Sequence, residues 1–415
     1  METHLADWLK GTPDGVQAQA ILRSCVHCGF CAATCPTYQL LGDELDGPRG
    51  RIYLIKQVVE GQMPTRATQE HLDRCLTCRS CETTCPSGVQ YGRLLDIGRK
   101  LVDERVPRSP EQRVVRAALR QGMTRRWLFD PAMRAGQALR SFLPGVLRDS
   151  VPARRDPGPW PVRSHPHRVL MLDGCAQPAM MPRIDAATAR VLDAIGVQAV
   201  IAPRSGCCGA INQHLSAHED ALVDARRNID AWWPFLDPQS KWPAQALLIN
   251  ASGCGAMVKE YAHLLRDDPA YASRAQKVVE LTFDLAQWLP AQFTAARQAG
   301  KVSVRRPPAD RVAFHSPCSL QHAQQVRGEV ETLLAGLGVT VQPVAQSHLC
   351  CGSAGTYAVL QPVLSRQLRD NKLAHLQAGQ PQMVLSANIG CISHLQAGTD
   401  TPVRHWIEWL DDAIA

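Results

Sequence analysis

The stretch "CVHCGFCAATCP", residues 25–36, carries four cysteines and a proline directly after the last of them. The chain repeats this arrangement at residues 75–86 with "CLTCRSCETTCP". Both segments follow the spacing C-x2-C-x2-C-x3-C-P, which is the ligand pattern of bacterial two-cluster iron–sulfur proteins. The two segments therefore predict a pair of [4Fe-4S] clusters near the N-terminus, and with them a path for single electrons.

In two-cluster proteins the fourth thiolate of each cluster comes from the other motif, because one tight loop reaches only three irons. We therefore expect one cluster on Cys25, Cys28, Cys31 and Cys85, and the other on Cys75, Cys78, Cys81 and Cys35. Structural zinc sites use pairs of C-x2-C rather than triplets with a proline-terminated fourth cysteine. Disulfides suit a reducing compartment poorly. Both alternatives fit the spacing less well than iron–sulfur clusters do.

The composition, with 45% hydrophobic and 20% charged residues among 415, is that of a soluble globular protein of two or three domains. No apolar run approaches the roughly 20 residues of a membrane-spanning helix. The beginning, "METHLADWLKGTPDG", has no apolar segment of a secretory signal. We expect a cytoplasmic location, where sixteen cysteines indicate metal or redox chemistry.

Residues 1–104 hold both cysteine motifs, and Ile, Leu and Val at helical spacing predict helices over 50–61 and 91–106. Residues 105–168 form a connector with fourteen arginines, no lysine and four acidic residues, and its proline-rich end indicates an exposed linker. Apolar residues at helical spacing over 111–149 suit an anionic membrane surface, an acidic partner or a solvated helix. Nucleic acid is disfavoured because no stacking platform or base-reading motif accompanies the arginines.

The remainder, 169–300 and 301–415, contains one pattern twice. An apolar strand leads into a cysteine in "RVLMLDGC" and "RVAFHSPC", and helical segments follow at 184–196 and 326–338. A second strand then leads to the paired cysteines of "GCCGA" and "LCCGS", and a third strand leads to a last cysteine. Strands that alternate with helices predict two parallel α/β domains.

Each repeat places its cysteines just beyond the carboxyl ends of strands, where ligands gather in parallel sheets. We expect two convergent groups, Cys175, Cys207, Cys208 and Cys254 in the first repeat and Cys318, Cys350, Cys351 and Cys391 in the second. They are candidate ligands of further iron–sulfur clusters, or else small buried hydrophobes. The nearby His315, His348 and His394 are expected to support the thiols or lie on the surface, with His394 the best candidate for a ligand.

Nucleotide-binding motifs are missing, since no G-x-G-x-x-G follows a strand and no P-loop occurs. We therefore expect no flavin or nucleotide site and no catalytic residue on this chain. Oxidation of an alcohol releases two electrons, whereas each iron–sulfur cluster carries one. The hydride acceptor is expected on another polypeptide, whose electrons this chain carries onward.

These motifs, together with "GCAQP", "NIDAWWP", "ASGCGAMVKEY", "ANIGCISHL" and "VRHWIEW", resemble the iron–sulfur subunits of glycolate oxidase over nearly the whole chain. The resemblance implies an α-helical ferredoxin domain followed by two α/β Cys-Cys-Gly domains. It also implies FAD-containing partner subunits that oxidise glycolate to glyoxylate, electron delivery towards quinone, and peripheral attachment to the cytoplasmic face of the inner membrane. Subunits that serve lactate or glycerol-3-phosphate dehydrogenases share this architecture.

One departure concerns the ends of the two repeats. Similar repeats in heterodisulfide reductase subunits close with C-x-x-C, whereas the closing words here are "CGAM" and "CISH", one cysteine short in each copy. The repeats could hold a four-thiolate cluster, a non-cubane cluster or none. A reductase-like catalytic role for the repeats is therefore a second hypothesis, and a zinc-stabilised scaffold is a third.

Overall fold

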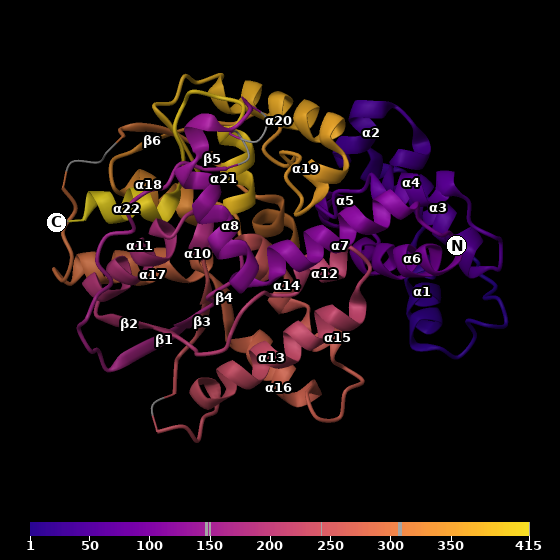
Figure 1. Ribbon diagram of the computed structural model, residues 1–415, viewed down its shortest axis with the longest axis horizontal. Coiled ribbons are helices and arrows are strands. Elements are labelled where there is room, and N and C mark those ends of the chain that lie inside the picture. Colours follow the sequence, from indigo (N-terminus) through magenta and orange to yellow (C-terminus); the bar gives the residue numbers. More distant parts are fainter. Residues whose placement is uncertain (146–147, 149–150, 242, 306–308, 415) are drawn as a thin grey trace.

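The computed structural model describes residues 1–145, 148, 151–241, 243–305 and 309–414. A helical N-terminal domain lies beside two stacked α/β repeats, which confirms the predicted fold class (Figure 1). The predicted helices 50–61 and 91–106 correspond to α3 and α6. The N-terminal helices are α1 (Pro13–Ser24), η1 (Phe30–Thr34), α2 (Pro36–Leu41), η2 (Glu44–Asp46), α3 (Pro48–Val59), α4 (Arg66–Asp73), α5 (Ser80–Thr84) and α6 (Tyr91–Arg105).

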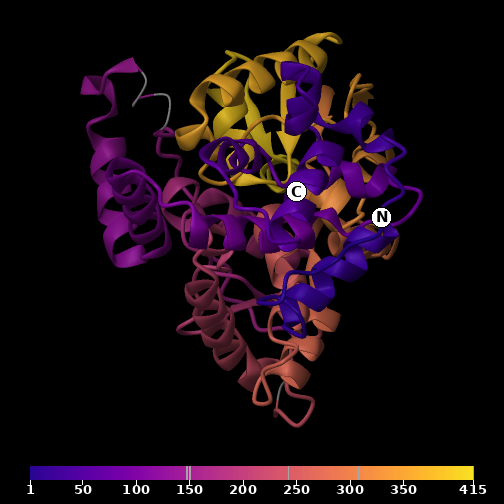
Figure 2. The same ribbon diagram turned by 90° about the vertical axis from the view of Figure 1, so that its right-hand side faces the viewer.

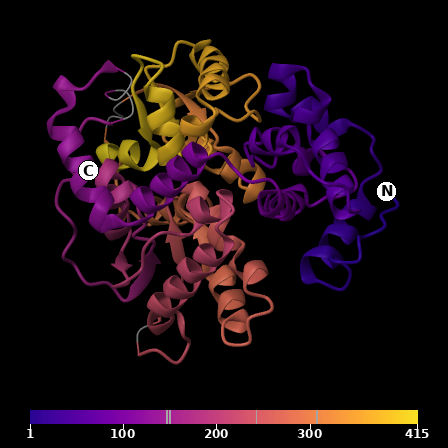
Figure 3. The same cartoon turned by 45° about the vertical axis from the view of Figure 1, so that its right-hand side comes forward.

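Helices α1, α3 and α6 build the core of the N-terminal domain. Each helix contributes a fully buried side chain to one hydrophobic cluster: Leu22 from α1, Ile55 from α3 and Leu95 from α6. Residues three and four apart lie on the same face of a helix. The apolar spacing that predicts α3 and α6 therefore also gives each helix the apolar face that packs in this core. Figure 3 shows this domain as a separate body beside the repeats.

Each repeat contains a four-stranded parallel sheet, with the strand orders β2-β1-β3-β4 and β6-β5-β7-β8. The first repeat comprises β1 (His167–Met171), α10 (Gln177–Met180), α11 (Arg183–Ala194), β2 (Val197–Ile201), α12 (Ala210–His214), α13 (His218–Leu236), β3 (Leu247–Ile249), α14 (Ser252–Lys259), α15 (Tyr261–Leu264), α16 (Ala272–Leu281), β4 (Thr282–Asp284) and α17 (Leu285–Gln298). The second comprises β5 (Arg311–His315), η4 (Ser319–Ala323), α18 (Glu329–Gly336), β6 (Thr340–Gln342), α19 (Tyr357–Leu360), α20 (Pro362–Gln377), β7 (Met383–Ser386), α21 (Ile389–Gln396), β8 (Val403–His405) and α22 (Trp406–Ala413). The sequence analysis missed the short fourth strands, β4 and β8.

One hydrophobic core joins the two repeats. Val169 of β1 and Val312 of β5 face this core, together with Phe293 of α17 and Trp406 of α22. Helix α11 packs against α22, and α17 packs against α18, so the inner helices of both repeats form a common layer between the sheets. Leu170 points to the opposite face of its sheet, towards α13 and α16, because side chains alternate along a strand.

The connector forms two helices, α7 (Pro110–Thr124) and α8 (Arg126–Ala138), and the short turn η3 (Arg140–Phe142). None of the residues of α7 or α8 is fully buried. The pair lies on the outside of the molecule (Figure 2), where Arg120 forms an ion pair with Asp220 of α13 at 3.5 Å. The predicted helical stretch 111–149 ends in positions 146–147 and 149, which lie outside the described residues. Within the described ranges, no helix has the length and apolar composition needed to cross a bilayer.

Candidate iron–sulfur centres and the domain interface

The two cysteine motifs bring their thiols together around two small cavities. One cavity, the first cysteine site, is lined by Cys25, Cys28, Cys31 and Cys85, and Cys81 lines it as well. The other, the second cysteine site, is lined by Cys35, Cys75, Cys78 and Cys81. Each cavity thus combines the first three cysteines of one motif with the fourth cysteine of the other.

The backbone of the two loops explains this convergence. His27 and Gly29 have positive φ angles of 57° and 85°, and the equivalent Thr77 and Arg79 have 52° and 59°. Left-handed residues turn the chain sharply, which lets three closely spaced thiols face the same point. Arg79 occupies the position that Gly29 holds in the first loop, and its guanidinium pairs with Glu260 of the first repeat at 2.6 Å.

The first cysteine site lies near the molecular surface. Cys28 is exposed, and the neighbouring Val26 and Phe30 are 68% and 61% exposed. The N-terminal ammonium donates to the Cys25 carbonyl at 2.8 Å, and Arg49, which lines the cavity, is half-exposed and paired with Glu44 at 2.6 Å. Burial, followed by the charge of Arg49, lowers the pKa of His27, so this imidazole is neutral at pH 7.

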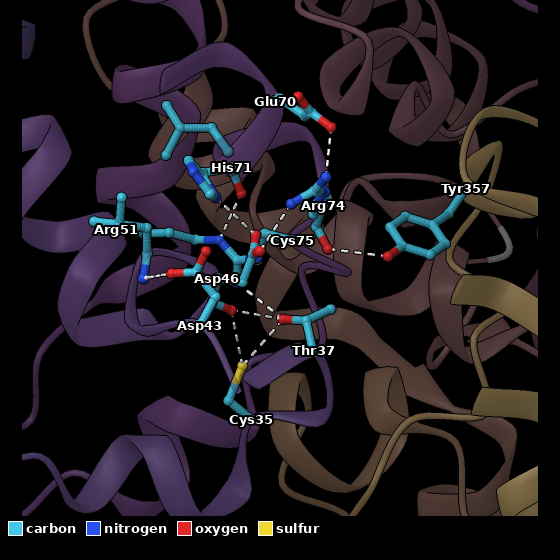
Figure 4. A network of polar contacts seen from close by, with 12 residues as sticks. Cys35, Thr37, Asp43, Asp46, Arg51, Glu70, His71, Arg74, Cys75 and Tyr357 are labelled. Atoms are coloured by element: carbon cyan, nitrogen blue, oxygen red, sulfur yellow. Dashed lines mark hydrogen bonds and ion pairs between the residues drawn. The ribbon is translucent and has the colours of Figure 1, made fainter. Parts of the chain in front are cut away.

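The second cysteine site lies deeper and is surrounded by polar groups (Figure 4). Arg51 is only 1% exposed and donates hydrogen bonds to the Thr37 hydroxyl at 3.1 Å and to the His71 carbonyl at 2.7 Å. Asp46 accepts from Arg51 at 3.3 Å and from Arg74 at 2.9 Å. This buried network joins α3 and α4 behind the thiols.

Three hydrogen-bonding groups also reach sulfur atoms at the second cysteine site. The Tyr91 hydroxyl lies 3.6 Å from Cys75 Sγ, and the Thr77 backbone N–H lies 3.5 Å from the same sulfur. The Thr37 hydroxyl lies 3.3 Å from Cys35 Sγ but donates its proton to the Asp46 carbonyl at 2.8 Å. The two donors to Cys75 Sγ stabilise a negatively charged sulfur.

Both sites fit a [4Fe-4S] cluster by the chemistry of their donors. Each presents four thiols from two crossing loops, as a cube with four iron corners requires. The second site also has buried arginines, which balance the negative charge that four thiolates and a cluster would bring into the interior.

The Cys-Cys-Gly cysteines also gather as their positions after the strands predict. In the second repeat, Cys318 Sγ lies 3.8 Å from Cys350 Sγ, and the ligand atoms of His315, Cys351 and Cys391 lie within 4.8 Å of one another. The thiols of Cys318 and Cys351, followed by the Gly352 N–H at 3.4 Å, hold the pKa of Cys350 well below its usual range.

The first repeat has the same local arrangement around Cys207. Contacts with the thiols of Cys175 and Cys208, together with the Gly209 N–H at 3.4 Å, lower the pKa of Cys207. The contact between Cys208 and Cys254 completes the group. The structure therefore brings together both predicted sets of four thiols.

The three histidines near the thiols differ in position. Burial lowers the pKa of His315 to about 3, and its Nδ1 lies 2.9 Å from the Ser386 hydroxyl. His394 Nε2 lies 3.2 Å from the Ser365 hydroxyl and equally close to the Ser365 carbonyl. The backbone carbonyl of His348 lies 2.8 Å from His322 Nε2. Of the three, only His315 belongs to the group of closely spaced ligand atoms, whereas the sequence favoured His394 as a ligand.

A cavity of about 340 Å³ lies where the N-terminal domain meets both repeats. Cys318, Cys350 and Cys391 of the second repeat line it, together with Leu76 of the second cysteine motif and His214 of α12. Within the described residues, the cysteines of the first repeat do not line this cavity. The two sets of repeat thiols therefore have different surroundings.

Direct contacts connect the second cysteine site to the second repeat. Leu76 and Cys78 pack with Cys318, Cys350 and Tyr357 in one apolar cluster. Burial, followed by the charge of Cys350, raises the pKa of Cys78. The Tyr357 hydroxyl donates to the Arg74 carbonyl at 3.1 Å, which fixes the two domains side by side (Figure 4).

Comparison with known families assigns the same regions. Residues 21–89 match the family described as a 4Fe-4S dicluster domain, so the N-terminal domain is of the iron–sulfur type. Residues 169–259 and 312–396 each match the cysteine-rich domain family. The crystal structure of a hypothetical protein from Helicobacter pylori has a TM-score of 0.54 over 96% of this chain and 72% of that chain, with 11% identity. This last likeness concerns the fold alone.

Relatives are similar to the chain over most of its length. The glycolate oxidase iron-sulfur subunit of Escherichia coli (strain K12) is 53% identical, over 100% of this chain and 99% of its own. The probable glycolate oxidase iron-sulfur subunit of Bacillus subtilis (strain 168) is 32% identical, over 91% of this chain and 89% of its own. Lactate utilization protein A of Shouchella clausii is 26% identical but covers 57% of this chain. The chain therefore belongs to the family of glycolate oxidase iron-sulfur subunits.

Proposed function

We propose that this chain is the electron-transfer subunit of a glycolate dehydrogenase, and that it carries electrons from a flavin-containing partner towards quinone. The pair of four-cysteine cavities in one domain carries the proposal. Similarity to relatives that are named glycolate oxidase iron-sulfur subunits supports the choice of substrate over lactate or glycerol-3-phosphate. When bound, a [4Fe-4S] cluster accepts and releases one electron at a time.

The ligands in this proposal are the eight motif cysteines in their crossed arrangement. Cys25, Cys28, Cys31 and Cys85 hold the first cluster, and Cys35, Cys75, Cys78 and Cys81 hold the second. Anaerobically purified protein should contain about eight iron atoms with matching acid-labile sulfide, at four per cluster. A folded chain with zinc in place of iron would contradict the proposal.

Activity is expected only in the complex with the flavin subunit. The isolated chain should show reducible iron–sulfur signals without oxidising glycolate. The complex co-purified from native cells should reduce a dye with glycolate and more slowly with lactate or glycerol-3-phosphate. Glycolate oxidation by the isolated chain, or a preference for another hydroxy acid, would overturn this part of the proposal.

The flavin subunit is proposed to bind at the exposed rim of the first cysteine site. Val26 and Phe30 flank the exposed Cys28, and apolar groups at a protein surface favour association when a partner covers them. Phe30→Glu should weaken co-purification of the flavin subunit, whereas Val223→Glu, on the equally exposed face of α13, should not. Equal retention of the subunit by both variants would contradict the assignment.

The connector is proposed to attach the protein to an anionic bilayer. Trp127 and Phe142 are exposed beside arginines such as Arg125 and Arg134, the combination that favours an interfacial position. The double variant Trp127→Ala and Phe142→Ala should lose binding to phosphatidylglycerol vesicles, while Val223→Ala retains it. Equal binding to neutral phosphatidylcholine vesicles would contradict an electrostatic contribution.

The second repeat is proposed to pass electrons to the acceptor. Its thiols line the cavity at the domain interface and touch the second cysteine site through Cys78. This arrangement also favours the second hypothesis, in which Cys350 and its neighbours themselves reduce a quinone or a disulfide. Turnover of the complex with a water-soluble quinone, compared with a small disulfide, separates these acceptors.

A further inference from the structure

The two cysteine sites differ in the charge that surrounds them. At the first site, Arg49 is half-exposed and its charge is offset by Glu44. The partly buried N-terminal ammonium donates to the Cys25 carbonyl at 2.8 Å, so this site also has a nearby positive charge, although no guanidinium of a fully buried arginine. At the second site, Arg51 lines the cavity and is 1% exposed. Water screens a charge at the surface but not one in the interior, so Arg51 acts on its site far more strongly than Arg49 does.

Arg99 adds a second buried cation beside the second site. Its guanidinium is 8% exposed and donates to the carbonyl oxygens of Cys75 and Leu72, both at 2.8 Å. Among the described residues, Arg99 forms no ion pair, and the nearby Asp73, whose pKa its charge helps to lower, is itself paired with Arg108 and Arg116. Asp46 offsets part of the charge of Arg51, but Arg74 shares the same carboxylate.

Hydrogen bonds to sulfur show the same asymmetry. The Tyr91 hydroxyl and the Thr77 N–H both reach Cys75 Sγ, at 3.6 and 3.5 Å. In the described part of the chain, no hydrogen bond from another residue reaches a thiol that belongs only to the first site. Positive charge and hydrogen bonds to sulfur both favour the reduced form of an iron–sulfur centre, which carries one more negative charge.

Burial acts in the opposite direction. The first site is closer to solvent, and water also stabilises a more negative centre. In place of this solvation, the second site has two buried guanidinium groups, of Arg51 and Arg99, and two hydrogen-bond donors to Cys75 Sγ. Because these groups are fixed in a medium of low polarity, their combined effect exceeds that of partial exposure to water.

We propose that Arg51, Arg99 and the Tyr91 hydroxyl give the second site a higher reduction potential than the first. Electrons that enter at the exposed rim of Cys28 then collect at the second site, which touches the second repeat through Cys78. The inference rests on the proposed function, because it takes the eight cysteines as cluster ligands. It adds a direction of electron flow and names residues that sequence analysis did not select.

The test is an anaerobic redox titration of the full-length, iron-loaded chain, followed by electron paramagnetic resonance. Two reduced-cluster signals with separate midpoint potentials are expected. Arg99→Met, which removes the charge and keeps most of the side-chain volume, should shift the higher-potential signal to more negative potential. Arg99→Lys, which restores the charge, should return the signal towards its wild-type potential. Arg49→Met, at the exposed and paired cation, should move neither signal.

Two further variants complete the assignment. Cys28→Ser alters a thiol of the first site alone, so the signal whose line shape changes belongs to that site. Tyr91→Phe removes one hydroxyl from Cys75 Sγ with minimal disturbance and should shift the same signal as Arg99→Met, in the same direction. This variant keeps the test decisive if Arg99→Met does not fold.

The possible outcomes distinguish the order of the two potentials from the cluster assignment itself. If Tyr91→Phe and Arg99→Met move neither signal, or move the signal marked by Cys28→Ser, the potential order is wrong while the cluster assignment stands. If the wild-type chain lacks two signals, the proposed function fails and this inference fails with it.

Discussion

The two Cys-Cys-Gly repeats have the same sheet order and the same grouping of four thiols, but they face different neighbours. Cys318, Cys350 and Cys391 border the interdomain cavity, and Cys350 packs against the second cysteine motif. The equivalent Cys207 in the first repeat is buried away from that cavity. In the part of the chain that the structure describes, both repeats contact the N-terminal domain, but only in the second do the thiols themselves pack against the second cysteine motif, so duplicated chemistry need not mean duplicated function.

The largest expected difference between the copies is in turnover. Cys350→Ser should reduce glycolate-dependent quinone reduction by the complex by roughly 10- to 100-fold, the range seen when a metal centre loses a supporting group. Cys207→Ser should leave turnover close to the wild-type value, because Cys207 does not line the interdomain cavity through which the second repeat meets the second cysteine site. Steady-state assays of both variants, with the iron content of each as a control, test the distinction. Equal losses would mean that both repeats take part.

The glycine after each cysteine pair is expected to differ in its tolerance of a side chain. Gly352 and Gly209 have φ angles of 90° and 88°, so alanine at either position costs about 1–2 kcal/mol. A Cβ at Gly352 would lie 2.6 Å from the backbone oxygen of Ser365, whereas one at Gly209 would lie 3.1 Å from that of Ala221. Gly352→Ala should therefore lower the free energy of unfolding by roughly 3 kcal/mol or more. Denaturant unfolding of both variants measures the difference, and equal losses would contradict it.

The helix caps of the two repeats are expected to respond oppositely to pH. Asp284 caps α17 and His405 caps α22 through their side chains. Burial raises the pKa of Asp284 to about 6 and lowers the pKa of His405 to about 3. As the pH falls from 7 to 5, the folded state gains a proton at Asp284, which stabilises it. Over the same range the unfolded state gains a proton at His405, whose ordinary pKa is about 6.5, which destabilises the fold.

Thermal unfolding at pH 7 and pH 5 checks this difference. Asp284→Asn should lose more stability than wild type on acidification, and His405→Asn should lose less, each by about 1–2 kcal/mol. Parallel behaviour of the two variants would show that the caps do not titrate as their burial indicates.

The smallest expected effect concerns the contacts that join the repeats. Arg190 of α11 pairs with Asp411 of α22 at 2.6 Å, and both side chains are mostly buried. Arg190→Ala should lower the free energy of unfolding by about 1 kcal/mol, at the upper end for such pairs. Arg297 of α17 donates to the Gly336 carbonyl from an exposed position and forms no ion pair within the described residues, so Arg297→Ala should have little effect. Unfolding of both variants at low and high salt provides the comparison, and an Arg190 effect that persists in high salt would point to lost packing instead.

The elements that the sequence predicts are those with strong local patterns. The helices over 50–61 and 91–106 and three strands of each repeat follow from apolar spacing. The three-residue strands β4 and β8 were missed because each runs directly into a helix, whereas the equally short β3 and β6 precede a cysteine motif that marks them. Ligand spacing within the cysteine motifs is also local, which is why the crossed grouping of thiols could be anticipated.

The surroundings of the thiols were harder to predict. Arg51 lies four residues before the buried Ile55, and Arg99 lies four residues after the buried Leu95, so both arginines occupy the apolar stripe of a helix. An arginine on the apolar face of a helix can be recognised from the sequence, so the burial of these two charges was predictable in principle. The interdomain cavity has no such sequence pattern, because it joins Leu76 to His214 and Cys318 through the packing of whole domains.

The common layer of α11, α17, α18 and α22 has a mechanical consequence. Because the two sheets press on the same helices, neither copy can pivot without opening the apolar interior of the other. The two repeats therefore behave as one rigid unit, and the distance between their two sets of four thiols stays constant. Any motion that gates electron transfer has to occur at the contact with the N-terminal domain, where Tyr357 and Glu260 hold this unit in place.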